Sequence, residues 1–220
     1  FGTKNLMHLS TLTEAGNFSN ERANLVFTNE NMQSKLINET IGNMERKGYD
    51  GLDIDFEFIY PEDRYDYVIF LQNMYKAINP LGYPLFSALA PKVSDTQQGT
   101  LYEGHDYGAI ASSVDKVLLM TYEWGYSYGP PMAVAPLTKV RQVVEYALTQ
   151  IPAEKLLMGI PNYGYNWTLP YEKGVTKAET IGNVGAVRLA VEYGAPIQYD
   201  QEAQSPYFTY RNQGREQEVW

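Results

Sequence analysis

Three carboxylates at alternate positions, Asp53, Asp55 and Glu57, are the residues of this chain best suited to chemistry. Residues two apart in a β-strand point to the same face of a sheet, so a strand here would carry all three acids on one face. The apolar residues that alternate with them would occupy the other face: Leu52, Ile54, Phe56 and Phe58. Because the apolar face must pack against helices, we expect the acids to point to the inner side of the sheet.

Glu57 is the candidate general acid of this segment. Neighbouring like charges and burial both raise the pKa values of carboxyl groups, and a general acid must stay protonated near neutral pH. Glu57 also comes last along the predicted strand. Active sites of parallel α/β folds lie at the C-terminal ends of the strands. The pattern therefore predicts acid–base chemistry at this end of the sheet.

Two other interpretations of the acidic strand are open. It could be an amphipathic strand with a solvated face, although parallel strands between helices have no such face. The acids could also hold a divalent metal through oxygen ligands, but such sites recruit ligands from several strands and the later strands offer few. The two histidines, His8 and His105, lack metal-binding spacing, so we expect each at the surface or in packing. We expect no metal and no cofactor.

Composition narrows the class of partner. A net charge of -9 would repel the phosphates of a nucleic acid, and no apolar run reaches the roughly 18 residues of a membrane-spanning helix. The absence of Cys excludes disulfides and thiolate sites, and no Gly-rich nucleotide-binding motif follows a strand. The 19 tyrosines suit either a sugar-binding groove or a Tyr-rich core and surface.

Strand-like and helix-like segments alternate over most of the chain. The predicted strands cover residues 5–10, 51–58, 85–90, 116–122 and 156–161. The predicted helices cover residues 31–47, 61–79, 107–113 and 136–150. Residues 17–20 are expected to be a loop. This alternation predicts an α/β fold with a parallel sheet and crossover helices.

The alternation stops after Trp167, which defines two expected domains. Beyond it we predict a helix over residues 184–193 and a hairpin of strands 207–211 and 216–220, which together form a small α+β insertion. Residues 1–167 would form the main domain and residues 168–220 the insertion. A (β/α)8 barrel takes about 250 residues, so five strands in about 165 residues predict an incomplete barrel. With no initiator Met and an end inside a predicted strand, we expect a piece of a longer protein.

Three motifs carry a resemblance to a known family. The sequence Asp50-x-x-Asp53-x-Asp55-x-Glu57 is similar to the D-x-x-D-x-D-x-E motif of family 18 glycoside hydrolases, the chitinase-like enzymes. The segment 116–122 resembles the sixth strand of that family with its Met-x-Tyr, and the segment 155–164 resembles the seventh with its G-x-P-x-Y-G. The resemblance implies a TIM barrel represented by about strands 3 to 7, with an α+β insertion after the seventh strand.

The segments 87–92 and 122–125 look most like the bacterial spore branch of this family. That resemblance implies an N-acetylglucosaminidase that acts on spore-cortex peptidoglycan during germination. It also implies a protein that is secreted or associated with the spore or cell wall, with possible flanking LysM modules. The glycan would be the partner, with no nucleic acid or membrane involved, and chitin stays open as a substrate.

The resemblance also implies roles for individual residues. These enzymes use the 2-acetamido oxygen of the substrate as the nucleophile, in a retaining mechanism. Glu57 would protonate the glycosidic oxygen and later activate water, Asp55 would hold the acetamide N–H, and Asp53 would share a proton or charge with Asp55. Tyr122 would hydrogen-bond the acetamide carbonyl.

Further residues at strand ends are candidates for substrate binding: Met120, Glu123, Trp124, Asn162, Tyr163 and Trp167. Glu123 departs from the family pattern, which often has Asp there. For the aromatic members, packing is an alternative to sugar stacking. Two competing functions are a non-catalytic carbohydrate-binding protein, which would usually lack the acid at position 57, and a metal-dependent hydrolase.

Overall fold

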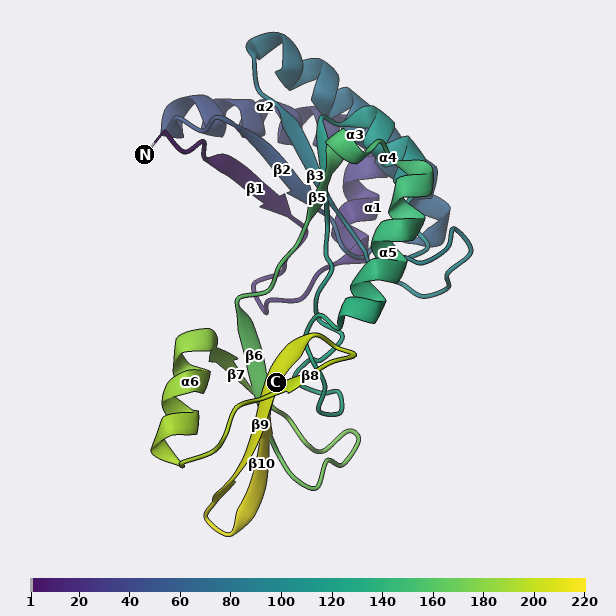
Figure 1. Cartoon of the computed structure of the whole chain (residues 1–220). Helices are drawn as coiled ribbons and strands as arrows, with labels where there is room; N and C mark the ends of the chain where they lie inside the picture. Colours follow the sequence, from purple (N-terminus) through teal and green to yellow (C-terminus); the bar gives the residue numbers. More distant parts are fainter. Residues whose placement is uncertain (1) are drawn as a thin grey trace. The chain divides into compact units, whose positions relative to one another are not determined.

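The computed structural model describes residues 2–220, which form two compact units. The first unit comprises the chain up to Met120 together with Val144–Met158, and the second comprises Thr121–Val143 and Gly159–Trp220. Figure 1 shows the elements of both units. No helix of the described residues is long and apolar enough to cross a membrane.

The first unit is built on a five-stranded parallel sheet in the order β1-β2-β3-β4-β5. The strands are β1 (Leu6–Ser10), β2 (Gly51–Asp55), β3 (Leu85–Leu89), β4 (Lys116–Leu119) and β5 (Leu156–Met158). All five predicted strands are therefore present in sequence order, and the α/β class with a parallel sheet is confirmed. Within the described residues the sheet is open, because β1 and β5 each pair with one strand, so this is no closed barrel.

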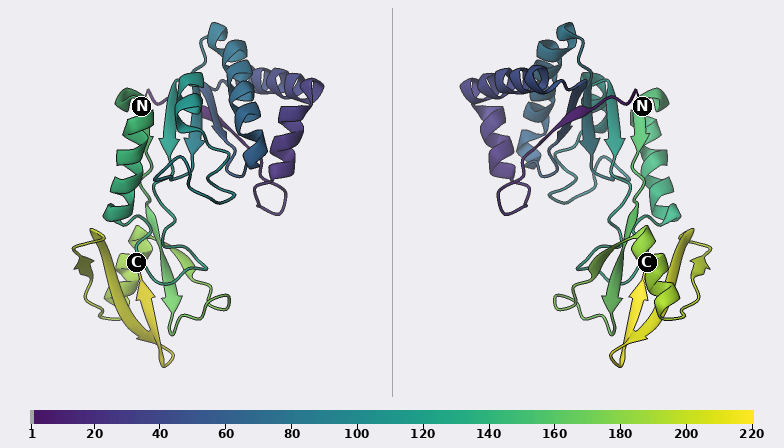
Figure 2. Two further views of the ribbon diagram at one scale, coloured as in Figure 1. Left: turned by 90° about the vertical axis from the view of Figure 1, so that its right-hand side faces the viewer. Right: turned by 90° about the vertical axis from the view of Figure 1, so that its left-hand side faces the viewer.

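Helices cover one face of this sheet (Figures 1 and 2). They are α1 (Asn20–Thr28), α2 (Glu30–Lys47), α3 (Arg64–Ile78) and α4 (Tyr107–Ser113), with short 3-10 turns η1 (Pro61–Asp63), η2 (Asn79–Leu81) and η3 (Ala153–Lys155). The helix α5 (Leu137–Gln150) contributes residues to both units. The prediction of a loop at residues 17–20 was wrong in part, because Ser19 accepts a hydrogen bond from the Arg22 N–H and starts α1 there.

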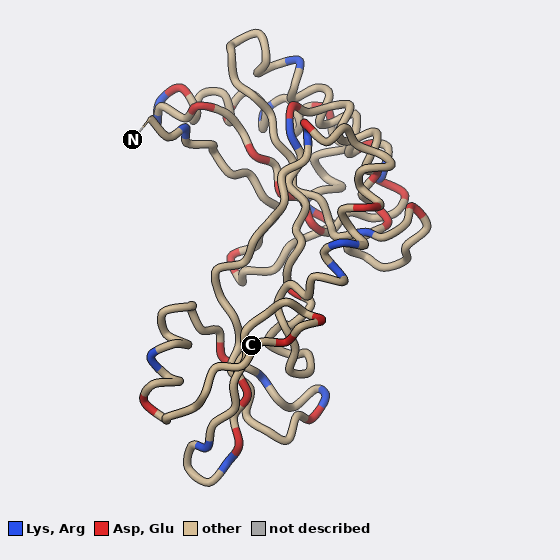
Figure 3. The backbone as a smooth tube through the Cα atoms, in the orientation of Figure 1, with Lys and Arg blue, Asp and Glu red and all other residues tan. Residues whose placement is uncertain are grey.

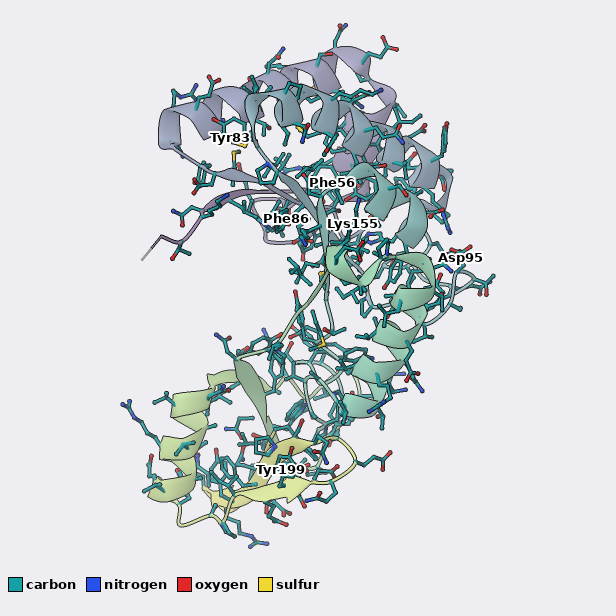
Figure 4. The ribbon with its side chains drawn as sticks, turned by 45° about the horizontal axis from the view of Figure 1, so that its top comes forward. Phe56, Tyr83, Phe86, Asp95, Lys155 and Tyr199 are labelled. Atoms are coloured by element: carbon teal, nitrogen blue, oxygen red, sulfur yellow. The ribbon has the colours of Figure 1, made fainter. Side chains whose placement is uncertain are left out.

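The apolar residues of β2 pack against the helices. Leu52 and Ile54 are fully buried, and Phe56 is 2% exposed. The Phe56 side chain is labelled in Figure 4. Its ring stacks on the rings of Tyr67 and Phe70 from α3, with centroids 6.0 and 5.5 Å apart. This aromatic contact fixes which face of β2 meets the helices, and it leaves the alternate residues on the other face.

Four strands end earlier than the sequence predicts, and β3 does so by one residue, at Leu89. Strand β2 stops at Asp55 instead of residue 58, β4 stops at Leu119 instead of 122, and β5 stops at Met158 instead of 161. For β2 the cause is visible: the carbonyls of Phe56 and Glu57 accept hydrogen bonds from the His105 ring. Glu57 therefore lies just beyond the strand.

The second unit contains an antiparallel sheet in the order β7-β6-β10-β9-β8. Its elements are β6 (Tyr163–Thr168), β7 (Glu179–Gly182), α6 (Asn183–Glu192), β8 (Gln198–Asp200), β9 (Ser205–Asn212) and β10 (Arg215–Val219). The predicted helix and hairpin are present, and Gln213 and Gly214 take the left-handed conformation that the hairpin turn requires, with φ of 50° and 79°. The strands β6, β7 and β8 were not predicted.

Candidate active site

Two of the three predicted catalytic carboxylates lie side by side along β2. Asp53 and Asp55 are half-buried, and they occupy the face opposite to Leu52 and Ile54, as the alternation predicts. Figure 3 shows the acidic positions along the backbone in red. Phe86 of β3 is in register with Asp53 and shares this face. We call this surface, formed by Asp53 and Asp55, the acidic face of β2.

His8 from the neighbouring strand contacts both aspartates. In the β1–β2 register His8 lies opposite Asp53. Its Nδ1 is 2.9 Å from Asp53 Oδ2, and its Nε2 is 3.5 Å from Asp55 Oδ2. His8 is exposed, as expected for a surface residue. The strand pairing in addition brings its ring onto the acidic face of β2.

The Asp55 carboxyl is held in an environment that disfavours its charge. Burial raises the pKa of Asp55, the nearby His8 ring lowers it, and Asp53 raises it again. Its Oδ1 atom is buried and has no hydrogen-bond partner among the described residues. Buried carboxylate oxygens are normally hydrogen-bonded, so Asp55 Oδ1 is an unusual atom in this respect.

Glu57 is positioned through its backbone by the second histidine. His105 Nε2 lies 3.1 Å from the Phe56 carbonyl and 3.2 Å from the Glu57 carbonyl. The His105 Nδ1 accepts a hydrogen bond of 3.1 Å from the Ala90 N–H, at the end of β3. These partners assign the tautomer with the proton on Nε2, which donates to the two carbonyls. His105 thus ties the end of β2 to the end of β3.

The segment after β3 is itself fixed by buried polar contacts. The Lys92 side chain is fully buried, and its Nζ donates to the His105 carbonyl at 2.8 Å. The Lys92 N–H donates to the Tyr107 hydroxyl at 2.9 Å, and that hydroxyl donates to the Ala90 carbonyl. Because Lys92, Tyr107 and Ala90 are linked by these hydrogen bonds, the segment that contacts the His105 ring is rigid.

Protonation of His105 should destabilise the fold in acid. Burial lowers the pKa of His105 from 6.5 to about 4, so the unfolded chain takes up this proton at a higher pH than the folded one. Its contribution to stability is complete above pH 6.5 and is lost as the pH falls to about 4. We expect the free energy of unfolding to fall over that range by on the order of 3 kcal/mol through this residue.

Urea unfolding of the wild-type protein and of His105→Gln across this pH range measures the effect. The variant keeps a donor and an acceptor but cannot take up the proton, so its stability should depend less steeply on pH. Equal pH dependence in the two proteins would contradict the assignment of a neutral, buried His105.

In the second unit, Glu123 is the centre of a small polar cluster. Its φ of 67° is unusual for a residue other than glycine, and its carboxylate accepts hydrogen bonds from the hydroxyls of Tyr163 and Tyr165. The Tyr165 bond measures 2.8 Å. Burial and then the bond to Glu123 raise the pKa of Tyr165 to about 12, so it remains a donor. Glu123 and Tyr163, both predicted to bind substrate, are thus brought together.

The remaining candidates differ in accessibility. Trp124 is half-buried and Asn162 is exposed, whereas Met120 is buried. Trp167 is fully buried, its indole N–H donates to the Gly129 carbonyl at 2.8 Å, and the half-buried Tyr122 packs against the same cluster. Packing in the core therefore explains the position of the Trp167 side chain without a sugar stacked on it.

Among residues 2–220 no three His, Asp or Glu side chains form a group that could hold a metal ion.

Comparison with known proteins gives consistent matches. The cortical fragment-lytic enzyme of Bacillus subtilis is 46% identical over 216 residues, which are 98% of this chain and 50% of that protein. The crystal structure of the Bacillus cereus spore cortex-lytic enzyme SleL has a TM-score of 0.95 at 39% identity, over 99% of this chain and 50% of that one. The Bacillus megaterium enzyme SleL has a TM-score of 0.93 at 41% identity, over 98% and 49% of the two chains.

The chain spans about half the length of the curated relatives it matches. The family model for glycosyl hydrolases family 18 matches residues 5–220. The family resemblance carried by the three motifs is thereby confirmed. The resemblance of the segments 87–92 and 122–125 to the spore branch is confirmed by the similar cortex-lytic enzymes. Because the model covers almost the whole chain, this chain belongs to glycosyl hydrolases family 18.

Proposed function

We propose that the protein hydrolyses β-1,4-linked N-acetylglucosamine glycans by a retaining, substrate-assisted mechanism, with spore-cortex peptidoglycan preferred over chitin. The similarity to cortical fragment-lytic and spore cortex-lytic enzymes supports the choice of peptidoglycan. We further propose that the chain forms part of a (β/α)8 barrel, with its insertion after the seventh strand.

The single observation that carries this proposal is the Asp55 carboxylate. Its Oδ2 lies near His8, while its buried Oδ1 has no partner among the described residues. A 2-acetamido group supplies an N–H donor of the kind that Oδ1 lacks. A hydrogen bond from this N–H would orient the acetamide so that its carbonyl oxygen can reach the anomeric carbon.

The chemistry then needs one acid–base residue and no enzyme nucleophile. Glu57 donates its proton to the glycosidic oxygen as the acetamide oxygen attacks the anomeric carbon, which breaks the glycosidic bond and leaves an oxazolinium ion. Glu57, now a carboxylate, takes a proton from water as that water opens the ring with net retention. Asp53 shares a proton with Asp55, and Tyr122 hydrogen-bonds the acetamide carbonyl.

We further propose that a set of residues at or near strand ends binds the glycan: Met120, Glu123, Trp124, Asn162 and Tyr163. The Glu123 carboxylate, which accepts hydrogen bonds from Tyr163 and Tyr165, would also accept hydrogen bonds from sugar hydroxyls. Trp167 supports the segment around Gly129 from the core. We propose that the protein acts at the spore or cell wall, and that flanking LysM modules would hold it on the glycan.

Product analysis tests the proposed function. The full-length protein is incubated with decorticated spore peptidoglycan and, separately, with chitin oligomers, and the new reducing ends are identified by mass spectrometry. We expect reducing N-acetylglucosamine ends from peptidoglycan at a higher rate than from chitin. Reducing muramic ends, or no cleavage of either glycan, would contradict the proposal.

A mimic of the cyclised intermediate provides a second test. A thiazoline analogue of the oxazolinium ion should inhibit hydrolysis competitively, with an inhibition constant at least about 100-fold below that of N-acetylglucosamine. Steady-state kinetics with both compounds measure the ratio. Inhibition no tighter than that by the simple sugar would speak against acetamide participation.

A further inference from the structure

We propose that His8 is a positioning residue that holds Asp53 and Asp55 in the orientation the reaction requires. This inference rests on the proposed function, because it assigns the residue that orients the acetamide-binding carboxylate. The sequence places His8 outside every motif of the family resemblance, and only the strand pairing brings it to the acidic face of β2.

The geometry allows one ring to serve both carboxylates. In the parallel register His8 lies opposite Asp53, and Ser10 lies opposite Asp55. The imidazole nitrogens face different aspartates, Nδ1 at 2.9 Å from Asp53 Oδ2 and Nε2 at 3.5 Å from Asp55 Oδ2. The ring therefore occupies one oxygen of each carboxylate and leaves Asp55 Oδ1 as the oxygen for a ligand donor.

The charge of the ring decides how many carboxylates it can bond. A neutral imidazole donates a hydrogen bond from one nitrogen, and the protonated ring donates from both.

On this side of β2 the acids that face His8 are Asp53 and Asp55. Asp50, before the strand, accepts from the Asn5 N–H at 2.7 Å, and Glu57 lies beyond the strand end. α1 to α4 cover the opposite face (Figure 1). His8 lowers the pKa of Asp55 against the effects of burial and of Asp53.

Two effects of His8 can be separated by substitution. As a hydrogen-bond donor it fixes the side chain of Asp53, and as a positive charge it favours the ionised form of Asp55. His8→Ala removes both effects, whereas His8→Gln keeps a donor without the charge. Ser10→Ala is the matched control, because Ser10 is on the same strand and the same face. The His8 side chain is 53% exposed, so its replacement leaves no core cavity.

Steady-state kinetics of the full-length protein on an N-acetylglucosamine oligomer, from pH 4 to 9, form the test. We expect His8→Ala to lower kcat by about tenfold, the effect of losing one hydrogen bond to a charged group, with KM within about twofold. The acidic limb of its pH profile should move to higher pH. His8→Gln should regain most of the plateau kcat but keep the shifted limb, and Ser10→Ala should match the wild type.

A second readout keeps the inference separate from the proposed function. The carboxyl carbon of Asp55 is titrated by NMR in the wild-type protein and in His8→Ala, and its titration should move to higher pH in the variant. If the wild-type protein cleaves no N-acetylglucosamine glycan, the proposed function fails while this titration still decides the role of His8. An unchanged titration, or an unchanged kcat and pH profile in an active enzyme, would overturn the inference.

Discussion

Replacing Glu57 by Gln in the full-length protein is expected to lower kcat on N-acetylglucosamine oligomers by at least about 10²–10⁴-fold. The amide has nearly the same shape as the carboxyl group but cannot donate a proton to the glycosidic oxygen, nor accept one from water. Both chemical steps of the proposed mechanism depend on this one residue, so the loss should reach the upper end of that range. Oligomer binding, measured by calorimetry, should persist.

Glu45→Gln makes the same chemical change at an exposed position on α2 and serves as the control. It should leave kcat unchanged. Both variants should stay folded, because His105 contacts Glu57 through its backbone carbonyl, which the substitution leaves in place. Retention by Glu57→Gln of more than about a tenth of the wild-type activity would exclude the general-acid role.

The largest effect should follow from a change in the substrate and not in the enzyme. In the proposed mechanism the acetamide oxygen is an intramolecular nucleophile, and such groups reach effective molarities of about 10⁵–10⁸ M. A β-1,4-glucan has a hydroxyl group in place of the acetamide and lacks this nucleophile. Asp53 and Asp55 both contact His8. In the proposed mechanism they orient the acetamide group, and neither of them is the nucleophile.

The sequence alone predicts the architecture that carries the carboxylates. Period-two alternation in β2 gives the correct faces, because Leu52 and Ile54 must be buried and only the opposite face can hold Asp53 and Asp55. The five parallel strands follow from the same reasoning. The end of β2 could not be predicted, since the hydrogen bonds that replace the strand pairing at Phe56 come from His105, 49 residues further along the chain.

The roles of the two histidines could not be derived from local pattern either. His8 and His105 stand outside any motif, and each reaches β2 through a tertiary relation. For His8 a signal exists in principle: on an adjacent parallel strand, alternate residues share the acidic face, so the pairing register would have identified it. For His105 no such signal exists, because it lies in an irregular segment.

In the second unit the hairpin could be predicted from the sequence, but β6 and the edge strands β7 and β8 could not. Tyr163, Tyr165 and Trp167 alternate along β6, with Trp167 fully buried and Tyr165 7% exposed. Aromatic residues that pack against a core and aromatic residues that stack on a sugar have the same composition and spacing. The two roles could therefore be separated for Trp167 only by its burial and its hydrogen bond to Gly129.

The measurement that tests the central claim most directly is the ratio of kcat/KM for two oligomers of equal length and linkage. One is β-1,4-linked N-acetylglucosamine and the other is β-1,4-linked glucose, each with the same chromogenic leaving group. Substrate assistance predicts a ratio of at least about 10³ in favour of the acetamido oligomer, with the loss mainly in kcat. Comparable kcat values for the two oligomers would contradict the account, because the hydrolysis would then proceed without the acetamide oxygen.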